Sequence, residues 1–312
     1  MTANETYAHQ SVMLEEVLQV LPLDAAGFYI DATFGRGGHS RALLERLGPD
    51  ARLVGIDRDP EAIQAGQQLE RAEARFRIVA GRFDCLADVA AREGRPLKGV
   101  LMDLGVSSPQ LDDARRGFSF LRDGPLDMRM DPTQGESAAD WLARADEKQI
   151  ADVLYRYGEE KKSRRIARAI CAQRIEQPIT RTQQLAELIE KVVGRSEPGK
   201  HPATRSFQAI RIFINQELEA LELALQQAVD ALAPGGRLAV ISFHSLEDRI
   251  VKQLIRDASG RAPRGRGGLP LGEEQPVTLK PVGKAMHASE AEVKVNPRAR
   301  SAVLRVAEKV AG

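Results

Sequence analysis

The chain has 312 residues, enough for one large domain or for a domain that carries an insertion. Hydrophobic residues make up 43% and charged residues 29% of it, which excludes a globally disordered protein and a small disulfide-stapled one. No apolar run of about 18 residues occurs, and the N-terminus has no basic region followed by an apolar segment, so we expect a cytoplasmic protein without membrane span or signal peptide. Cys85 and Cys171 stand in unrelated contexts without a CxxC or histidine pattern, so we predict two free thiols and no metal site.

The net charge is only +1, but it is unevenly distributed along the chain. Residues 155–215 carry 13 basic and 6 acidic side chains, and residues 249–312 carry the same numbers. Residues 216–248, between them, carry 1 basic and 6 acidic side chains. Two basic blocks of this kind fit contact with a polyanion, although solvated helix faces give similar counts.

From residue 28 to residue 104, short apolar runs alternate with helical patterns, which is typical of a parallel sheet covered by helices. The glycine turn GRGG separates the first run from a helix that contains Leu43 and Leu44, and Pro60 suits the first turn of the next helix. The fourth run is almost continuously apolar, as in a strand that is covered on both faces. We predict four strands, at residues 28–33, 52–56, 76–79 and 97–104.

After Gly105 this alternation stops for about 110 residues, too long for an ordinary connection. We therefore predict that residues 111–215 form an inserted helical domain and that residues 1–110 and 216–312 together form the sheet domain. A Pro- and Gly-rich hinge, SEPGKHPATR, interrupts the helical patterns of this region. The patterns predict helices at residues 138–144, 159–175, 182–193 and 204–232.

The last part of the chain returns to the sheet. Pro234, Gly235 and Gly236 end the long helical pattern, and residues 237–243 form the next strand. A helix follows His244 to about Asp257, residues 259–285 are predicted to be a mobile loop, and residues 301–306 are predicted to be the final strand. The fold class is α/β, with a doubly wound, mostly parallel sheet and an inserted helical domain.

The first strand-to-helix turn has the residues of a nucleoside site. Gly35, Gly37 and Gly38 allow a ligand to approach the backbone, and Asp31 precedes them. Asp57 ends the second strand about 20 residues later, where a carboxylate can accept hydrogen bonds from two ribose hydroxyls. This pairing favours an adenosine cofactor over a purely structural tight turn.

S-adenosylmethionine (SAM) fits the turn better than other adenosine cofactors do. FGRGG does not match GxGxxG, and nothing matches GxxxxGK[ST], so neither a pyrophosphate nor a triphosphate is specifically accommodated. SAM has no phosphate, and its sulfonium cation tolerates carboxylates such as Asp31 and Asp103. Phe83, after the third strand, is suited either to stacking on adenine or to simple core packing.

Another group of polar residues follows the fourth strand in MDLGVSSPQLD. Ligands of open α/β sheets lie at the carboxyl ends of the strands, so this segment is expected to border the reactive end of the cofactor. The alternative interpretation of Asp103 is that it only caps the end of its strand. Three predicted strands end in an acidic residue, however, and this favours a ligand-binding site. The residues concerned are Asp103, Ser107, Ser108 and Gln110.

Long and unusual strings show a resemblance to a known family. DATFGRGGHS, DLGVSSPQLDDARRGFSF, YGEEKKSRRIARAI, HPATRSFQAIRIFIN and ISFHSLEDRIVK resemble the small-subunit ribosomal RNA methyltransferase H family, and the resemblance runs from about His9 to Arg305. It implies a Rossmann-like methyltransferase fold and SAM-dependent methylation of the exocyclic N4 of a cytidine in 16S rRNA at the ribosomal P site. It also implies the 30S subunit as partner and leaves a homodimer open.

The resemblance also implies which residues contact the cofactor. The sequence pattern alone ranks the histidine among them low, because a histidine at a helix start is more often a solvated or capping residue. The implied contacts are Gly37, Gly38, His39, Asp57, Phe83, Asp103 and Gln110.

Transfer to the cytosine amine requires hydrogen-bond acceptors that localise its lone pair. Amino-methyltransferases acting on DNA commonly place a DPPY-like tetrapeptide after the fourth strand, whereas this chain has DLGV, so the pattern does not assign the acceptor. We expect it to be Asp103 with the backbone carbonyls of residues 104–107. Ser108 and His244 are second choices, and His244 equally suits fixing a strand-to-helix turn.

RNA requires a docking surface, since the target base must leave its stack or be presented unpaired. Basic residues of the insertion and of the C-terminal part are candidates for phosphate contact. The predicted RNA contacts are Ser108, Arg164, Arg168, Lys200, Arg205, His244 and Arg298.

Three other functions compete with this prediction. A noncatalytic RNA-binding or ribosome assembly factor with a methyltransferase fold is the main alternative. The absence of GxGxxG opposes an NAD-dependent oxidoreductase, and the basic insertion opposes a small-molecule methyltransferase.

Overall fold

The computed structural model describes residues 11–194, 201–260 and 276–311. The chain forms two compact units, one of residues 1–105 and 219–312 and the other of residues 106–218. The limits expected from the sequence, after residues 110 and 215, lie a few residues from these. Within the described ranges, no helix combines the length and the apolar character that crossing a membrane requires.

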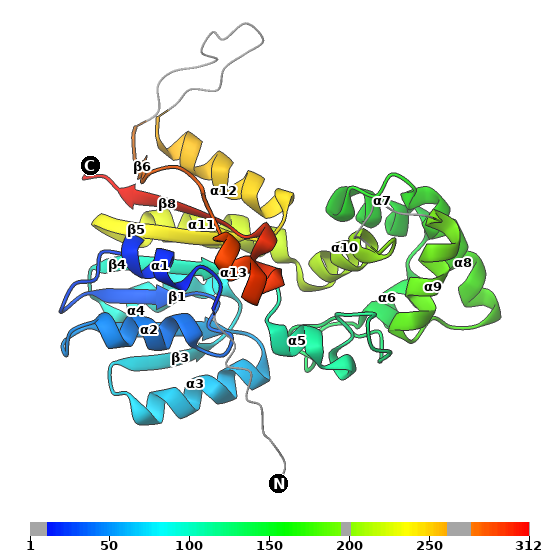
Figure 1. The fold of residues 1–312 in the computed structure, drawn as a ribbon, viewed down its shortest axis with the longest axis horizontal. Helices are drawn as coiled ribbons and strands as arrows, with labels where there is room; N and C mark the ends of the chain where they lie inside the picture. The colour runs from blue at the N-terminus through cyan, green and yellow to red at the C-terminus, as the bar shows by residue number, and fades with distance from the viewer. Residues whose placement is uncertain (1–10, 195–200, 261–275, 312) are drawn as a thin grey trace, which may run out of the picture. The chain divides into compact units, whose positions relative to one another are not determined.

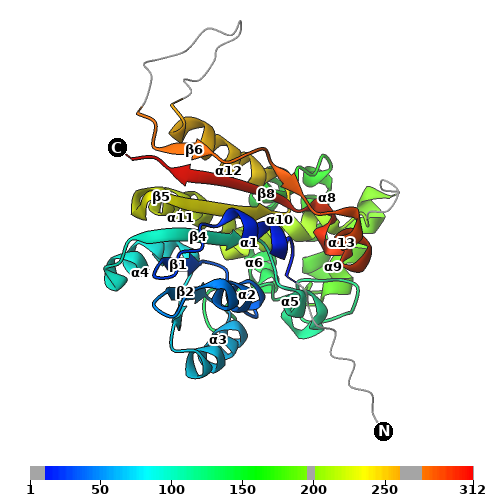
Figure 2. The same cartoon turned by 60° about the vertical axis from the view of Figure 1, so that its left-hand side comes forward.

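The first unit is built on one sheet with the strand order β3-β2-β1-β4-β5-β8-β6 (Figure 2). The neighbours among β1 to β5 are parallel, and β8 is antiparallel to β5, β6 and β7. The mostly parallel α/β sheet predicted from the sequence is therefore confirmed. The strands are β1 (Phe28–Asp31), β2 (Arg52–Asp57), β3 (Phe76–Ala80), β4 (Leu97–Asp103), β5 (Leu232–Ser242), β6 (Leu279–Pro281), β7 (Met286–His287) and β8 (Val303–Lys309).

Helices cover both faces of this sheet (Figure 1). Side chains alternate between the faces along β4, with Leu101 in one buried cluster and Val100 and Met102 in the other. The Leu101 face is covered by α1 (Leu14–Val20), α2 (Gly38–Arg46) and α3 (Pro60–Ala72). The opposite face is covered by α4 (Leu86–Glu93), α11 (Glu217–Ala231) and α12 (Ser245–Ala258). The short elements η1 (Phe83–Cys85), α13 (Glu290–Val295) and η3 (Pro297–Ser301) complete the unit.

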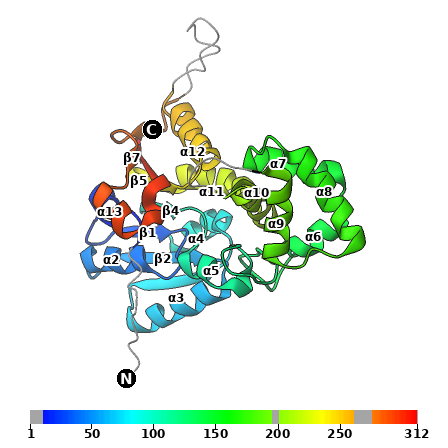
Figure 3. The same ribbon diagram turned by 45° about the vertical axis from the view of Figure 1, so that its right-hand side comes forward.

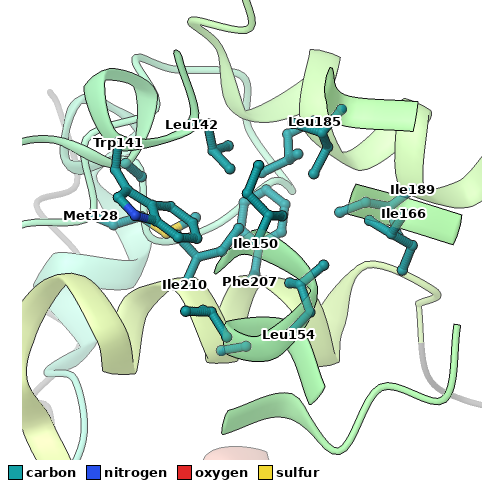
Figure 4. Close-up of a cluster of buried hydrophobic side chains, with 14 of the residues drawn as sticks. Met128, Trp141, Leu142, Ile150, Leu154, Ile166, Leu185, Ile189, Phe207 and Ile210 are labelled. Atoms are coloured by element: carbon teal, nitrogen blue, oxygen red, sulfur yellow. The ribbon is translucent and has the colours of Figure 1, made fainter. Parts of the chain in front are cut away.

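The second unit is helical (Figure 3). Buried apolar side chains such as Trp141, Leu154 and Ile210 gather between its helices, as Figure 4 shows, because each helix has an apolar stripe that must be covered. Its elements are α5 (Ser108–Asp112), η2 (Ala114–Arg116), α6 (Ala138–Arg144), α7 (Glu147–Gly158), α8 (Ser163–Glu176), α9 (Thr182–Val193) and α10 (Thr204–Asn215).

The single helix predicted over residues 204–232 is wrong. The chain forms α10 and α11, which are separated by Gln216 in the left-handed conformation (φ 51°). The side chain of the preceding Asn215 is buried and binds a neighbouring segment, donating to the carbonyl of Met128 (2.7 Å) and accepting from the N–H of Met130 (2.8 Å). These tertiary bonds fix the break, and the uninterrupted apolar periodicity does not reveal it.

Three further boundaries differ from the prediction. β5 begins at Leu232 and contains Pro234–Gly236, which a register shift against β4 accommodates. The basic helix begins at Ser163 because Glu159 ends the unpredicted α7 in a left-handed conformation (φ 50°). β6 lies inside the predicted loop 259–285 and pairs with β8, which spans residues 303–309 rather than 301–306. Residues 195–200 of the hinge region and 261–275 of the loop lie outside the described residues.

Candidate active site

The turn between β1 and α2 requires glycine. Gly35 and Gly37 have φ of 58° and 76°, in the region that favours glycine. A Cβ on Gly37 would lie 2.6 Å from Cζ of Phe34. Gly37 is the N-cap of α2, and the first turn of a helix leaves backbone N–H groups without intrahelical partners. The turn therefore needs glycine for its backbone conformation and for its packing against Phe34, and its role toward a ligand stays a prediction.

Asp57, at the end of β2, is bonded to this turn. Its Oδ2 accepts from the N–H of Gly35 (2.7 Å), and its Oδ1 accepts from the N–H of Asp59 (2.9 Å). Burial raises the pKa of Asp57 to about 6. Because each carboxylate oxygen can accept more than one hydrogen bond, the predicted role toward ribose hydroxyls is compatible with these contacts.

Asp31, at the end of β1, is buried, and both of its carboxylate oxygens accept hydrogen bonds. The hydroxyl of Ser40 donates to its Oδ2 (2.6 Å), and the N–H of Thr33 donates to its Oδ1 (3.3 Å). Burial raises the pKa of Asp31 to about 6. Asp31 therefore ties β1 to the first turn of α2 and adds negative potential to this edge of the sheet.

Asp103, the last residue of β4, has the most perturbed carboxyl group of this edge. Its N–H donates to Oγ1 of Thr33 (2.6 Å), but its Oδ1 is buried without a hydrogen-bond partner, although 26% of the side chain is exposed. Burial, and then the charges of Asp31 and Glu247, raise the pKa of Asp103 to about 8. The group is therefore largely protonated at neutral pH, and a cation beside it would favour the ionised form.

His39 lies in the first turn of α2 and faces Asp103. Its Nε2 lies 3.0 Å from the carbonyl oxygen of Val12, and its Nδ1 lies 3.7 Å from Oδ2 of Asp103. Burial lowers the pKa of His39 to about 4, so the ring is neutral and the contact with Asp103 is not an ion pair. A neutral ring that donates from Nε2 to the carbonyl has its Nδ1 lone pair directed at Asp103.

His244 and Glu247 connect β5 to α12. His244 is the N-cap of α12, and its Nδ1 lies 3.5 Å from the N–H of Glu247. The carboxylate of Glu247 accepts from the N–H of Phe243 (2.9 Å) and lies 3.0 Å from Nε2 of His244, a pair that does not meet hydrogen-bond geometry. These contacts fit the turn-fixing reading of His244, and its contact with RNA stays a prediction.

Phe83 and Gln110, predicted to contact the cofactor, and Ser108, predicted to contact RNA, lie in two places. Phe83, in η1 after β3, is half-buried and packs against the sheet core. Ser108 and Gln110 belong to the second unit, where both are buried in α5. Oε1 of Gln110 accepts from the N–H of Ser107 (2.9 Å), so this side chain caps its own helix.

The predicted RNA-contacting arginines differ in exposure. Arg164 and Arg168 lie on the solvent side of α8, where Arg168 is 3.6 Å from a carboxylate oxygen of Glu147. Arg205 in α10 is half-buried, and Arg298 in η3 is exposed. Lys200 lies outside the described residues.

Sequence reasoning missed four residues of this edge. Thr33 and Ser40 orient the two aspartates, and Val12 binds the ring of His39. Glu247, in the first turn of α12, contributes to the raised pKa of Asp103. Thr33 and Ser40 stand beside the glycine turn in DATFGRGGHS, which was a usable signal. No local pattern points to Val12.

Together, the fold and the site define the class of protein to which the chain belongs. The strand order β3-β2-β1-β4-β5, continued by an antiparallel strand, is that of SAM-dependent methyltransferases, and three strands of the parallel part end in a carboxylate. The unpartnered Oδ1 of Asp103 and the glycine turn fit a cationic nucleoside cofactor. The chain is therefore a SAM-dependent methyltransferase. Within the described ranges, no three His, Cys, Asp or Glu side chains are grouped to hold a metal ion.

The chain belongs to the MraW methylase family, whose sequence profile matches residues 6–310. A relative from Alcanivorax borkumensis, named ribosomal RNA small subunit methyltransferase H, is 70% identical over 312 residues and covers 100% of both chains. A relative of the same name from Shewanella amazonensis is 57% identical over 312 residues, covering 98% of this chain and 99% of its own. A solved rRNA methylase from Streptococcus thermophilus is 11% identical with a TM-score of 0.43, covering 96% of this chain and 94% of that chain.

Proposed function

We propose that this methyltransferase methylates the exocyclic N4 of a cytidine in 16S rRNA at the P site of the decoding centre. The observation that carries the proposal is the buried, unpartnered Oδ1 of Asp103 at the carboxyl end of β4, an acceptor suited to an amine hydrogen. The names of the relatives support small-subunit rRNA as the substrate.

The proposed cofactor contacts are those of the sequence prediction. The glycine turn supplies close approach and donors, and Asp57 supplies acceptors. Phe83 provides an aromatic ring after β3, and the charge of Asp103 favours a cation. The residues proposed to hold SAM are Gly37, Gly38, His39, Asp57, Phe83, Asp103 and Gln110.

The chemical difficulty is that the cytosine amine delocalises its lone pair into the ring. Bound SAM would supply an electrophilic methyl group and, once the methyl–sulfur bond has broken, would leave as the neutral thioether S-adenosylhomocysteine. A hydrogen bond from the amine to Asp103, aided by backbone carbonyls of residues 104–107, localises the lone pair on N4 and orients it. When the new N–C bond has formed, N4 carries one proton more than the product, and Asp103 or water accepts it.

The test is transfer of labelled methyl groups from SAM to 30S particles that lack the modification, with the label mapped by nuclease digestion and mass spectrometry. We expect N4-methylcytidine at a single 16S position. Label on another base would overturn the N4 proposal, and the absence of label despite measurable SAM and RNA binding would contradict the rRNA substrate. Naked 16S rRNA, run in parallel, tests whether the assembled particle is required.

We propose that the exposed face of α8 contacts RNA phosphates. Replacing Arg164 and Arg168 together with alanine is expected to raise KM for 30S particles about 5- to 10-fold and to reduce the salt dependence of binding by about two charges. SAM affinity is expected to stay unchanged. The measurements are initial rates and RNA binding at several salt concentrations.

The matched control replaces Lys148 and Lys191, two exposed lysines on α7 and α9. It removes the same charge from the same unit but not from the α8 face. An equal rise in KM for 30S particles in both double variants would show that only net charge matters. It would contradict the proposal that the exposed face of α8 contacts RNA phosphates.

We also propose that the enzyme works in the cytoplasm on the 30S subunit. A homodimer stays a prediction, and sedimentation of the full chain across a concentration series tests it. A constant monomer mass would contradict it.

A further inference from the structure

Residues 11–13, just before α1, lie against the start of α2. The carbonyl of Val12 is 3.0 Å from Nε2 of His39. The hydroxyl oxygen of Ser11 lies 2.0 Å from the place that a Cβ on Gly38 would occupy. This segment, which we call the N-terminal strap, therefore touches two residues proposed to hold the cofactor.

The strap has an unusual backbone conformation. Met13 is the N-cap of α1 with φ 53° and ψ 37°, and its side chain is fully buried. A left-handed conformation of a non-glycine residue costs on the order of 1 kcal/mol or more, so surrounding contacts must stabilise it. Burial of the Met13 side chain is one of these contacts.

Another contact comes from the far end of the chain. The N–H of Met13 donates to Oε1 of Glu292, in α13, at 2.8 Å and across 279 residues of sequence. Figures 1 and 3 show α13 beside the N-terminal part of the chain. A hydrogen bond to a charged acceptor is stronger than a neutral one, so Glu292 is well suited to fix the strap.

The position of the N-terminal strap affects the surroundings of Asp103 through the ring of His39. With Val12 as its acceptor, the ring of His39 is held as the Nε2–H tautomer, and its Nδ1 lone pair faces Oδ2 of Asp103 at 3.7 Å. If the strap moved, His39 would lose its Val12 partner, and both its tautomer and its orientation would be free to change.

We propose that Glu292 is a positioning residue for the SAM site: by holding Met13, it places the Val12 carbonyl that fixes the tautomer and orientation of His39 beside Asp103. This role rests on the cofactor contacts proposed above. Glu292 contacts the N–H of Met13, and the carbonyl of the neighbouring Val12 contacts His39, so the effect of Glu292 passes through the strap.

The experiment compares three substitutions of Glu292 with one control. Glu292→Ala removes the acceptor, Glu292→Asp keeps the charge but shortens the reach, and Glu292→Gln keeps an acceptor oxygen. The control is Glu290→Ala, because Glu290 lies in the same helix and is exposed. Titration calorimetry of SAM onto the full chain, without RNA, measures affinity, and nitrogen NMR of labelled histidine reports the tautomer of His39.

We expect Glu292→Ala and Glu292→Asp to raise Kd for SAM about 10-fold, with a mixed His39 tautomer. Glu292→Gln is expected to stay within about 3-fold of the wild type, and Glu290→Ala to match it. A variant that lowers Tm but leaves SAM affinity and the tautomer unchanged would overturn the proposal in favour of a purely structural contact. If Glu292→Ala does not fold, the Asp and Gln variants decide by the same criteria.

The outcome is separate from that of the proposed rRNA methylation. A wild-type protein that binds SAM but does not label 16S rRNA would contradict the substrate proposal and leave the role of Glu292 intact. Conversely, unchanged SAM binding in the Glu292 variants would refute this role without affecting the substrate.

Discussion

Replacing Asp103 with asparagine is expected to lower the rate of methyl transfer about 100- to 1,000-fold and to stabilise the ligand-free protein. Asparagine has nearly the same shape, but it cannot accept the amine proton, and its NH2 group is a donor where an acceptor is needed. Single-turnover rates at saturating SAM and 30S particles measure the effect on chemistry. A loss of less than 10-fold would exclude Asp103 as the main acceptor.

The stability gain of this variant depends on pH. Because the pKa of Asp103 is about 8 in the folded protein, above the ordinary value of 3.8, the folded state binds more protons than the unfolded state between these values. The free energy of unfolding of the wild type therefore falls as the pH rises from about 4 to about 8. The Asp103→Asn variant does not lose stability in this way, because asparagine does not titrate. We expect the variant and the wild type to differ little near pH 4 and by several kcal/mol at pH 8.5, since each pKa unit between 3.8 and about 8 corresponds to about 1.4 kcal/mol.

Urea unfolding of the ligand-free wild type and variant across this pH range measures the difference. A gain that is constant with pH would contradict the raised pKa, since it would reflect a change in packing or hydrogen bonding instead. Asp31→Asn is not a suitable control, because Asp31 contributes to the pKa of Asp103. Asp88→Asn, at an exposed position of α4, removes one carboxylate elsewhere in the same unit.

The strands of the site could be read from the sequence because their signals are local. β1, β2 and β4 are apolar runs that each end in an aspartate, and the carboxyl ends of parallel strands meet at one edge. The glycine turn could also be predicted from the sequence, because two of its positions have φ values that residues other than glycine rarely adopt. These features of the sequence predict that Asp31, Asp57 and Asp103 lie at one edge of the sheet.

The features that the sequence did not reveal depend on contacts between distant segments. The break at Gln216 is fixed by Asn215, whose bonds to residues 128 and 130 cannot be read from an apolar repeat. The bond between Met13 and Glu292 joins opposite ends of the chain. Periodicity reports which face of an element is apolar, but not which buried polar group meets which partner.

Replacing Gly37 with alanine is expected to cost about 2 kcal/mol of stability and to raise Kd for SAM about 10- to 100-fold. Two effects act together. Alanine is strained at φ 76°, and its Cβ would lie 2.6 Å from Cζ of Phe34 and 2.7 Å from Cε2. Either the turn or the Phe34 ring must move, and the turn is the surface proposed to receive the cofactor. Chemical unfolding and SAM calorimetry measure the two losses.

Gly94→Ala separates strain from steric overlap. Gly94 has a similar φ of 61° at the C-terminus of α4, but a Cβ there meets nothing within 4 Å. We expect this control to cost about 1 kcal/mol and to leave SAM affinity unchanged. The excess cost of Gly37→Ala then measures the overlap with Phe34.

A double-mutant cycle with Phe34→Leu tests that assignment directly. Phe34 is buried and packs on Phe76 with ring centroids 5.3 Å apart, so Phe34→Leu alone is expected to destabilise the protein. Leucine lacks the Cζ atom, however, so in its presence Gly37→Ala should cost no more than the strain alone, and SAM affinity should partly recover. Additive effects would show that Phe34 is not what excludes a side chain at Gly37, and that the turn needs glycine for its backbone conformation alone.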